Sequence, residues 1–137
     1  GTSSAVAAAT EKLDGEIVSN PNQYWTDLRE QRHEFFKSPL PLWRLSVPSI
    51  SAPIDLPGQQ LIEWSGAQRW LLSDASSEVI RDAVAKIGGH ATRFNNQRGT
   101  GTIFHPLAPA IATLHRRLKT TFDPHGILNP GRMYPGV

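Results

Sequence analysis

The chain is 137 residues long, and 39% of its residues are hydrophobic, including four tryptophans and five phenylalanines. That composition is sufficient for the core of one ordinary domain. The net charge is only +2, which argues against a nucleic-acid-binding protein. The absence of cysteine excludes disulfides, thiolate metal ligands and a cysteine nucleophile.

The sequence has no candidate membrane span and no initiator methionine. No apolar run approaches the roughly twenty residues that a bilayer span needs. The alanine-rich start is followed by charged residues, so we expect a soluble chain. The single methionine is Met133. We therefore expect the sequence to be a piece of a longer protein.

The first part of the chain predicts two helices joined by a short strand. Residues 4–13 place apolar residues at helical spacing behind Ser4, a suitable N-cap. A second helix is expected from its cap Asn20 to about Phe36. Residues 16–19 between them read as a strand. The residues of the second helix expected to point inward are Trp25, Leu28 and Phe35.

The middle of the chain predicts antiparallel strands. Residues 42–47, "LWRLSV", alternate between apolar and polar residues as a half-buried strand does. Residues 61–64 and 69–73 flank "SGAQ", an arrangement typical of a hairpin with a short connection. Trp64 and Trp70 are expected on the two arms of this hairpin.

The remaining sequence predicts two more helices and one strand. A helix is expected over residues 76–89, a strand over residues 90–94, and a last helix over residues 107–122 after the loop "NNQRGTGTIFHP". The apolar positions that define the two helical faces are Val79, Ile80, Ala83, Val84 and Ile87, and Leu107, Ile111, Leu114, Leu118 and Phe122.

The order strand, helix, strand, hairpin, helix, strand is that of a split βαβ arrangement. We therefore predict an α+β fold, a ferredoxin-like antiparallel sheet covered by helices, with extra N- and C-terminal helices. Trp43, Trp64 and Trp70 are expected on or beside the sheet, with Ile80 and Leu114 packed against it.

Several familiar kinds of site have no support in the sequence. The five histidines lie at positions 33, 90, 105, 115 and 125, with no spacing that suits zinc. The "RGTGT" stretch lacks the further residues of a dinucleotide or phosphate loop, and a surface loop is the better interpretation. No serine lies in a G-x-S-x-G motif. We predict no metal site and no hydrolase.

Three basic residues are candidates for binding an anionic substrate. Arg29 and His33 lie four residues apart and are expected to share a face of the second helix, although composition favours a solvated face. Arg44 lies between Trp43 and Leu45 in a strand, so its side chain takes the opposite face of the sheet to both. That face of the sheet either binds a ligand or is exposed to solvent.

The C-terminal stretch "FDPHGILNPGRMY" contains more turn-forming residues than an ordinary C-terminal tail needs. Asp123-Pro124 and Gly126 are expected to end the last helix, and the Asn-Pro-Gly turn from Asn129 presents Arg132. The alternatives are a clasp on its own domain and a segment that docks elsewhere.

This ending, with "LREQRHEFF", "WSGAQRWLLSD" and "HATRF", resembles the C-terminal region of the FAD-binding small subunits of bacterial glycolate oxidases. Those subunits belong to the FAD-linked oxidases with a vanillyl-alcohol-oxidase-type flavin domain. The likeness covers nearly the whole chain. It implies a single C-terminal cap domain over residues 1–137, with FAD bound mainly by an N-terminal domain that lies outside this sequence.

The resemblance also implies roles for particular residues. Asn129 and Arg132 are the nearest to the flavin or to the domain junction. Arg29 lies where related hydroxy-acid dehydrogenases place an arginine for the substrate carboxylate, if one inserted residue is allowed. The implied reaction of the complete enzyme is oxidation of glycolate to glyoxylate, or of a related 2-hydroxy acid to its 2-oxo acid, with hydride transfer to the flavin. No catalytic residue of this chain is assigned.

The implied partners are a flavin-containing large subunit and an iron-sulfur subunit. The histidine-rich metal motif of the large subunit has no counterpart here. We expect the chain alone to be inactive and to bind FAD weakly, and the complex to be cytoplasmic or attached to a membrane through its other subunits. The alternative is a non-catalytic module that holds the subunits together.

Overall fold

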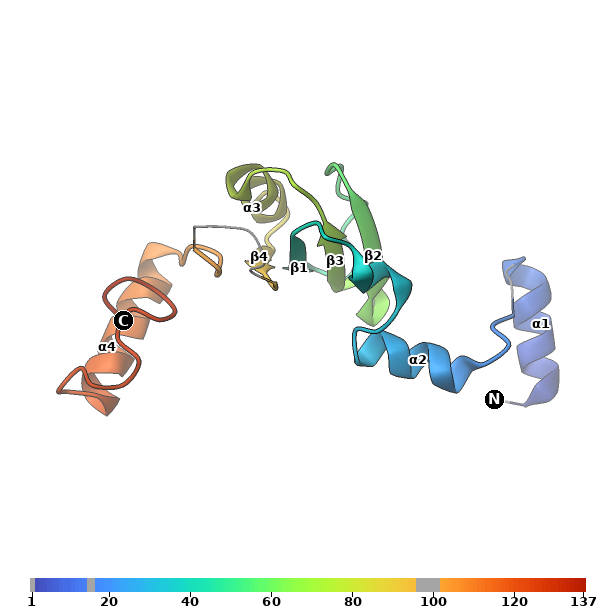
Figure 1. Cartoon of the computed structure of the whole chain (residues 1–137), viewed down its shortest axis with the longest axis horizontal. Helices are drawn as coiled ribbons and strands as arrows, with labels where there is room; N and C mark the ends of the chain where they lie inside the picture. Colours follow the sequence, from blue (N-terminus) through green and yellow to red (C-terminus); the bar gives the residue numbers. More distant parts are fainter. Residues whose placement is uncertain (1, 15–16, 96–101) are drawn as a thin grey trace. The chain divides into compact units, whose positions relative to one another are not determined.

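The structure is a computed structural model that describes residues 2–14, 17–95 and 102–137. The chain divides into two compact units, residues 1–38 and residues 39–137, and each is described by itself (Figure 1). The single-domain organisation stays a prediction.

The first unit contains α1 (Ser3–Leu13), α2 (Pro21–Arg29) and the 3-10 helix η1 (Glu34–Lys37). The Asn20 side chain caps α2 by accepting a hydrogen bond from the Gln23 N–H, as predicted. The N-cap of α1 is Thr2, two residues before the expected Ser4. Of the expected inward residues, Leu28 is buried and Trp25 is exposed.

The prediction that the second helix runs to Phe36 is wrong. Gln31 has a φ of 55°, a left-handed conformation that ends the helix. The N–H groups of Arg32 and His33 then turn back to the Asp27 carbonyl, at 2.7 and 3.1 Å. The expected strand at residues 16–19 is also absent from its described part, Ile17–Ser19.

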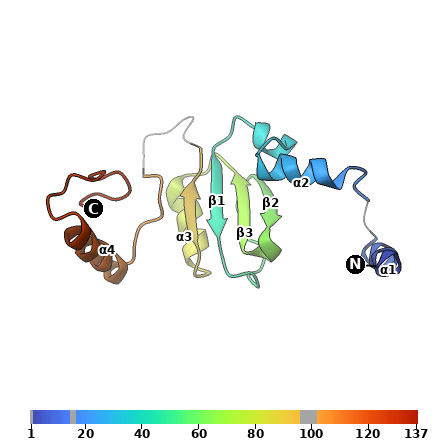
Figure 2. The same ribbon diagram turned by 90° about the horizontal axis from the view of Figure 1, so that it is seen from below.

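The second unit is built on a four-stranded antiparallel sheet with the order β2-β3-β1-β4. Figure 2 shows β1, β3 and β2 side by side. This is the ferredoxin-like strand order, so the predicted α+β fold class is confirmed. The strands are β1 (Leu42–Ser46), β2 (Gln59–Glu63), β3 (Gln68–Leu72) and β4 (His90–Arg93).

Helix α3 (Ser77–Ala85) packs on one face of this sheet. Its N-cap is Ser76, whose hydroxyl accepts from the Val79 N–H. Ile80 and Val84 are fully buried against the sheet, as predicted, whereas Val79 is exposed. The sheet residues of this core are Trp43, Leu45, Leu71 and Ala91.

The connection from β1 to β2 replaces the helix that a complete split βαβ unit has there. Residues 47–58 contain no helix or strand. The buried Arg69 of β3 holds this connection by donating to the carbonyls of Ser51 and Ala52, at 2.6 and 2.9 Å, and it also donates to the Gly66 carbonyl in the β2–β3 turn at 3.3 Å. Irregular backbone is therefore fixed by a side chain instead of by a helix.

The β2–β3 hairpin has the predicted four-residue connection, shifted by one residue to Trp64–Ala67. Trp64 therefore lies in the turn, with a φ of 51°, and is 77% exposed. The prediction that Trp64 lies on a strand of the hairpin is wrong. Trp43 and Trp70 lie on strands of the sheet, as predicted, and both are buried.

Helix α4 (Pro109–Phe122) is the last helix, and none of its residues is buried. The predicted apolar stripe is present, but Leu114 is 51% exposed and Phe122 is 79% exposed. The expectation that Leu114 packs against the sheet is therefore wrong. Periodicity identified the helix, but it does not specify what covers the apolar face.

Candidate functional site: a basic pocket and a C-terminal loop

The sheet face opposite α3 carries Arg44. In the antiparallel register Arg44 pairs with Thr92 and Ser46 pairs with His90. Directly paired residues point to the same face, so Arg44, Thr92 and His90 share one face, away from the buried Trp43. Arg44 is exposed and makes no hydrogen bond or ion pair within the described part of the chain. Its position in an inner strand is thus not explained by a structural partner.

Residues 102–108 run beside the edge strand β4. The Arg93 N–H donates to the Ile103 carbonyl at 2.9 Å, and the Ala91 N–H donates to His105 Nδ1 at 3.3 Å. Because Nδ1 accepts, neutral His105 carries its proton on Nε2 and is a hydrogen-bond donor there. Burial, followed by the charges of Arg81 and His90, lowers the pKa of His105, which favours this neutral form.

These segments enclose a pocket of about 370 Å³. The described residues that line it contribute donors and neutral polar groups, and none of them is acidic. A pocket of this kind suits a small organic anion. The lining residues are Arg44, His90, Thr92, Phe104, His105, Pro106, Leu107, Ala108, Ile111 and Tyr134. We call it the Arg44 pocket.

Asp123 organises the start of the C-terminal loop. Its carboxylate accepts from the N–H groups of Ile127 and Leu128, at 3.0 and 2.8 Å, and forms an ion pair with Lys119 at 2.7 Å. The hydrogen bond from Lys119, followed by that from Leu128, lowers the pKa of Asp123. The predicted end of the helix before Asp123 is confirmed.

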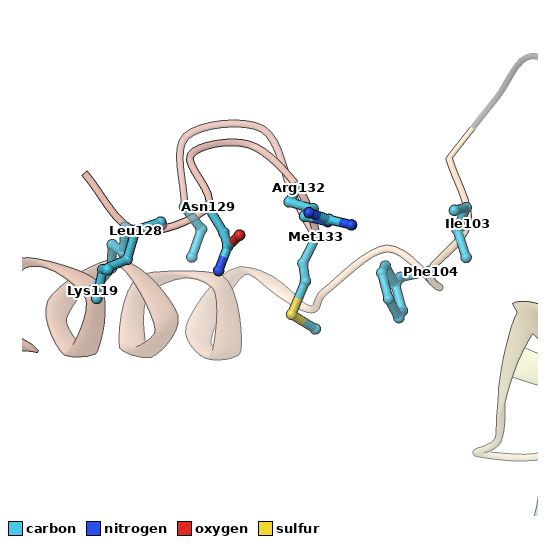
Figure 3. A pocket seen from close by; sticks show the side chains of 8 residues that line it. Ile103, Phe104, Lys119, Leu128, Asn129, Arg132 and Met133 are labelled. Carbon is cyan, nitrogen blue, oxygen red and sulfur yellow. The ribbon is translucent and has the colours of Figure 1, made fainter. Parts of the chain in front are cut away.

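The expected turn at Asn129 is also present, because the Arg132 N–H donates to the Asn129 carbonyl at 3.2 Å. Both side chains line a cavity of about 590 Å³ between the loop and α4 (Figure 3). Lys119 lines it from the helix, and the other walls are mostly apolar. The structure therefore brings the two predicted cofactor residues together. Their role toward FAD stays a prediction.

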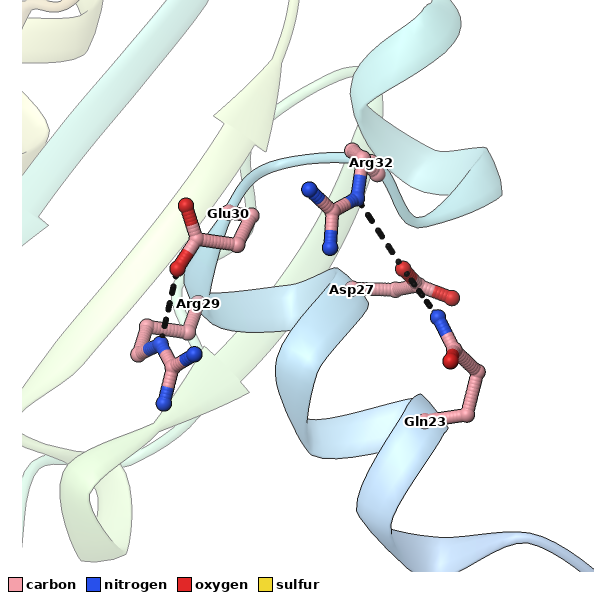
Figure 4. A network of polar contacts seen from close by, with 5 residues as sticks. All are labelled: Gln23, Asp27, Arg29, Glu30 and Arg32. Atoms are coloured by element: carbon pink, nitrogen blue, oxygen red, sulfur yellow. Dashed lines mark hydrogen bonds and ion pairs between the residues drawn. The ribbon is translucent and has the colours of Figure 1, made fainter.

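Arg29 and His33 do not share a helical face, because α2 ends at Arg29. Arg29 is exposed and forms an ion pair with Glu30 at 2.9 Å (Figure 4). His33 caps η1 by accepting from the Phe35 N–H and lies edge-on to Tyr24. Both belong to the first unit, whereas Arg44 belongs to the second. Their roles toward a substrate stay predictions.

Sequence reasoning missed His90, Thr92, His105 and Tyr134. His90 and Thr92 alternate along a predicted strand, but only the pairing of β4 with β1 places them beside Arg44. His105 lies in a loop, where no periodicity indicates a direction. Lys119 was likewise missed, although its spacing to Asp123 is that of an ion pair on a helix.

Comparison with known proteins finds a similarity in the C-terminal part of the chain. Residues 107–133, which include α4 and the Asn129 turn, match the family described as FAD linked oxidases, C-terminal domain. The resemblance inferred from the sequence is confirmed. Over 134 residues the chain is also 47% identical to the glycolate oxidase subunit GlcE of Escherichia coli K12. That alignment covers 98% of this chain.

The chain spans 37% of the length of this E. coli relative. No solved structure matches the chain. None of the described helices is long and apolar enough to cross a membrane. Within the same described ranges, no three His, Asp or Glu side chains are grouped as metal ligands.

Proposed function

We propose that this chain is the substrate-side C-terminal domain of an FAD-dependent glycolate oxidase subunit. The proposal is supported by the 47% identity to a glycolate oxidase subunit and by the match to the C-terminal domain of FAD linked oxidases. The observation that carries the substrate assignment is the Arg44 pocket, whose described lining contains hydrogen-bond donors and no acidic residue. Glycolate is a small carboxylate and suits such a lining.

The residues of the pocket have different roles in this proposal. The guanidinium of Arg44 binds the carboxylate of glycolate, and Nε2–H of His105 donates a second hydrogen bond. His105 is a donor in its neutral form, so it orients the substrate and is not the base that removes the hydroxyl proton. FAD, when bound by the rest of the subunit, accepts the hydride.

The C-terminal loop serves the cofactor side. The cavity at Asn129 and Arg132 has both hydrogen-bonding groups and apolar walls, and the side chains of these two residues have no partner among the described residues. Such a lining fits an edge of a flavin or the protein segment that carries it. In this proposal Asn129 and Arg132 hold that edge, while the main FAD site lies in the part of the subunit outside this chain.

A second candidate function is a non-catalytic module that holds the oxidase subunits together. The exposed apolar side chains of α4 and the loop favour it, because a surface of this kind usually meets another protein surface. The exposed apolar residues of this surface are Ile111, Leu114, Leu118, Phe122, Ile127, Leu128 and Met133. The partners in either case are the flavin-containing and iron-sulfur subunits of the complex.

The deciding experiment uses the complete oxidase complex with Arg44→Gln in this domain. We expect KM for glycolate to rise by about tenfold or more, since a hydrogen bond between charged groups contributes on the order of 1.5–3 kcal/mol. Arg117→Gln, at an exposed arginine on α4, is the matched control. An unchanged KM in Arg44→Gln, with normal assembly, favours the non-catalytic module.

A further inference from the structure

The indole of Trp43 lies between the sheet and two arginines. Trp43 is fully buried in β1. The guanidinium carbon of Arg93, on β4, is 5.1 Å from the centre of its ring, and that of Arg81, on α3, is 5.6 Å away. Both distances are within the range of a cation–π contact. The largest side chain of the core therefore contacts two positive charges.

Neither charge has an acidic partner among the residues that the structure describes. Arg81 donates to the hydroxyl and the carbonyl of Thr102, at 2.9 and 2.6 Å, and Arg93 donates to the Ser77 hydroxyl at 3.0 Å. All these acceptors are neutral, and within residues 2–14, 17–95 and 102–137 no ion pair involves either arginine. Burial, followed by the charge of Arg93, lowers the pKa of Arg81. Two neighbouring cations are thus left without a compensating charge.

The same three side chains also contain buried donors that have no acceptor among the described residues. They are Nε1 of Trp43, Nε of Arg81, and Nε and Nη1 of Arg93. Buried donors in folded proteins nearly always have a partner. Arg69 shows the contrast on the same face of the sheet, because its Nε, Nη1 and Nη2 each donate to a backbone carbonyl. Arg69 is a satisfied structural arginine, and the Arg81–Arg93 pair is not.

We propose that Arg81, Arg93 and the indole N–H of Trp43 form an oxyanion site that takes a carboxylate or a phosphate group. An oxyanion accepts hydrogen bonds from several donors at once and supplies the missing negative charge. A neutral ligand leaves the two cations uncompensated, and a cation is repelled. The site is separate from the Arg44 pocket, because Arg44 and Trp43 are neighbours in β1 and point to opposite faces of the sheet.

The oxyanion has two available sources, a free small anion or an Asp or Glu side chain from the part of the subunit outside this chain. The first measurement is the Tm of the 137-residue chain in increasing sodium phosphate at constant ionic strength. We expect a saturable rise of about 3 °C or more. The rise is expected to vanish in Arg81→Gln and Arg93→Gln and to persist in Arg117→Gln.

The variants separate specific binding from general stabilisation by phosphate, which acts on any folded protein. An equal rise in all four proteins, or no rise in the unsubstituted chain, overturns the proposal. If a glutamine variant does not melt cooperatively, Arg93→Lys and Trp43→Phe replace it. Each is expected to weaken phosphate binding several-fold, and unaltered binding in both overturns the proposal.

The complete subunit then identifies the source. A phosphate effect that persists there indicates a site for a free anion. If the effect is lost, and Arg93→Gln lowers the Tm of the subunit by more than Arg117→Gln does, the oxyanion is a carboxylate of the subunit itself. A complete subunit in which phosphate has no effect and Arg93→Gln matches Arg117→Gln contradicts the site.

Discussion

The α3 and α4 helices are both amphipathic, yet they have opposite surroundings. On α3 the apolar residues Ile80 and Val84 are fully buried in the core with the sheet. On α4 the equivalent residues Leu114 and Leu118 are each about half exposed, and no residue is buried. The comparison shows that an apolar stripe does not by itself decide burial, since the described part of the chain buries the stripe of α3 and leaves that of α4 exposed.

The largest expected loss of stability comes from a substitution on α3. Ile80→Ala is expected to lower the free energy of unfolding of the chain by about 2–5 kcal/mol, because it removes buried methyl groups and leaves a cavity. Leu114→Ala is the matched change on α4 and is expected to cost less than about 0.5 kcal/mol. Denaturant unfolding of both variants measures the difference. Similar losses contradict the contrast between the helices.

Two glycines with positive φ values allow a similar comparison between the sheet and the C-terminal loop. Gly58, with a φ of 122°, lies so close to β3 that a Cβ at this position is 2.1 Å from the Leu72 carbonyl oxygen. Gly131, in the C-terminal loop, has a φ of 69° and open space around it. We expect Gly58→Ala to cost about 2 kcal/mol or more and Gly131→Ala about 1 kcal/mol, the cost of the backbone conformation alone. Thermal melting with matched denaturant curves tests the order, and a larger loss in Gly131→Ala contradicts it.

A third prediction concerns what α4 meets in the complete subunit. There Leu114→Ala is expected to cost about 1–3 kcal/mol, because burial by a partner surface adds the transfer free energy of the side chain. The measurement is the Tm of the complete subunit, with Thr113→Ala on the same helix as control. A Leu114→Ala subunit that melts like the control means that this face of α4 stays in water.

Acid is expected to loosen the C-terminal loop before the sheet. The pKa of Asp123 is below its ordinary value of 3.8, so its contribution to stability is complete above that value and is lost as pH falls through the lower folded value. Amide NMR signals of Ile127 and Leu128 are expected to shift in that acidic window. The Val79 amide, capped by the Ser76 hydroxyl, is the control because that hydroxyl does not titrate. Asp123→Asn is expected to remove the shift.

A small effect on stability is expected for Asn129→Ala. The side chain is exposed, but Asn129 has a φ of 45°, which alanine tolerates less well than asparagine, so the change is expected to cost the chain no more than about 1 kcal/mol. In the complete subunit the same substitution is expected to weaken FAD retention or to change the flavin absorbance spectrum. A variant that destabilises the chain by more than about 1 kcal/mol and leaves the flavin unchanged identifies the loop as a clasp on its own domain.

The sequence by itself determined the local elements of this protein. The Asn20 cap, the β1 strand, the α3 helix and the Asn129 turn all depend on residues that are close together in the chain. Alternation along β1 also placed Arg44 opposite Trp43 and Leu45, because a strand has a period of two. The family resemblance came from short motifs of the same kind, spread over nearly the whole chain, and residues 107–133 match the family model.

Tertiary structure alone decided which residues meet. No local pattern indicates that β4 pairs with β1, which brings His90 and Thr92 beside Arg44, or that Arg81 and Arg93 converge on Trp43. The end of α2 and the exposure of Leu114 were also outside the reach of periodicity, because a left-handed residue and a missing partner leave the apolar spacing unchanged. The physical reason is that pairing and burial are set by contacts between distant segments, whereas propensity and capping act within one turn.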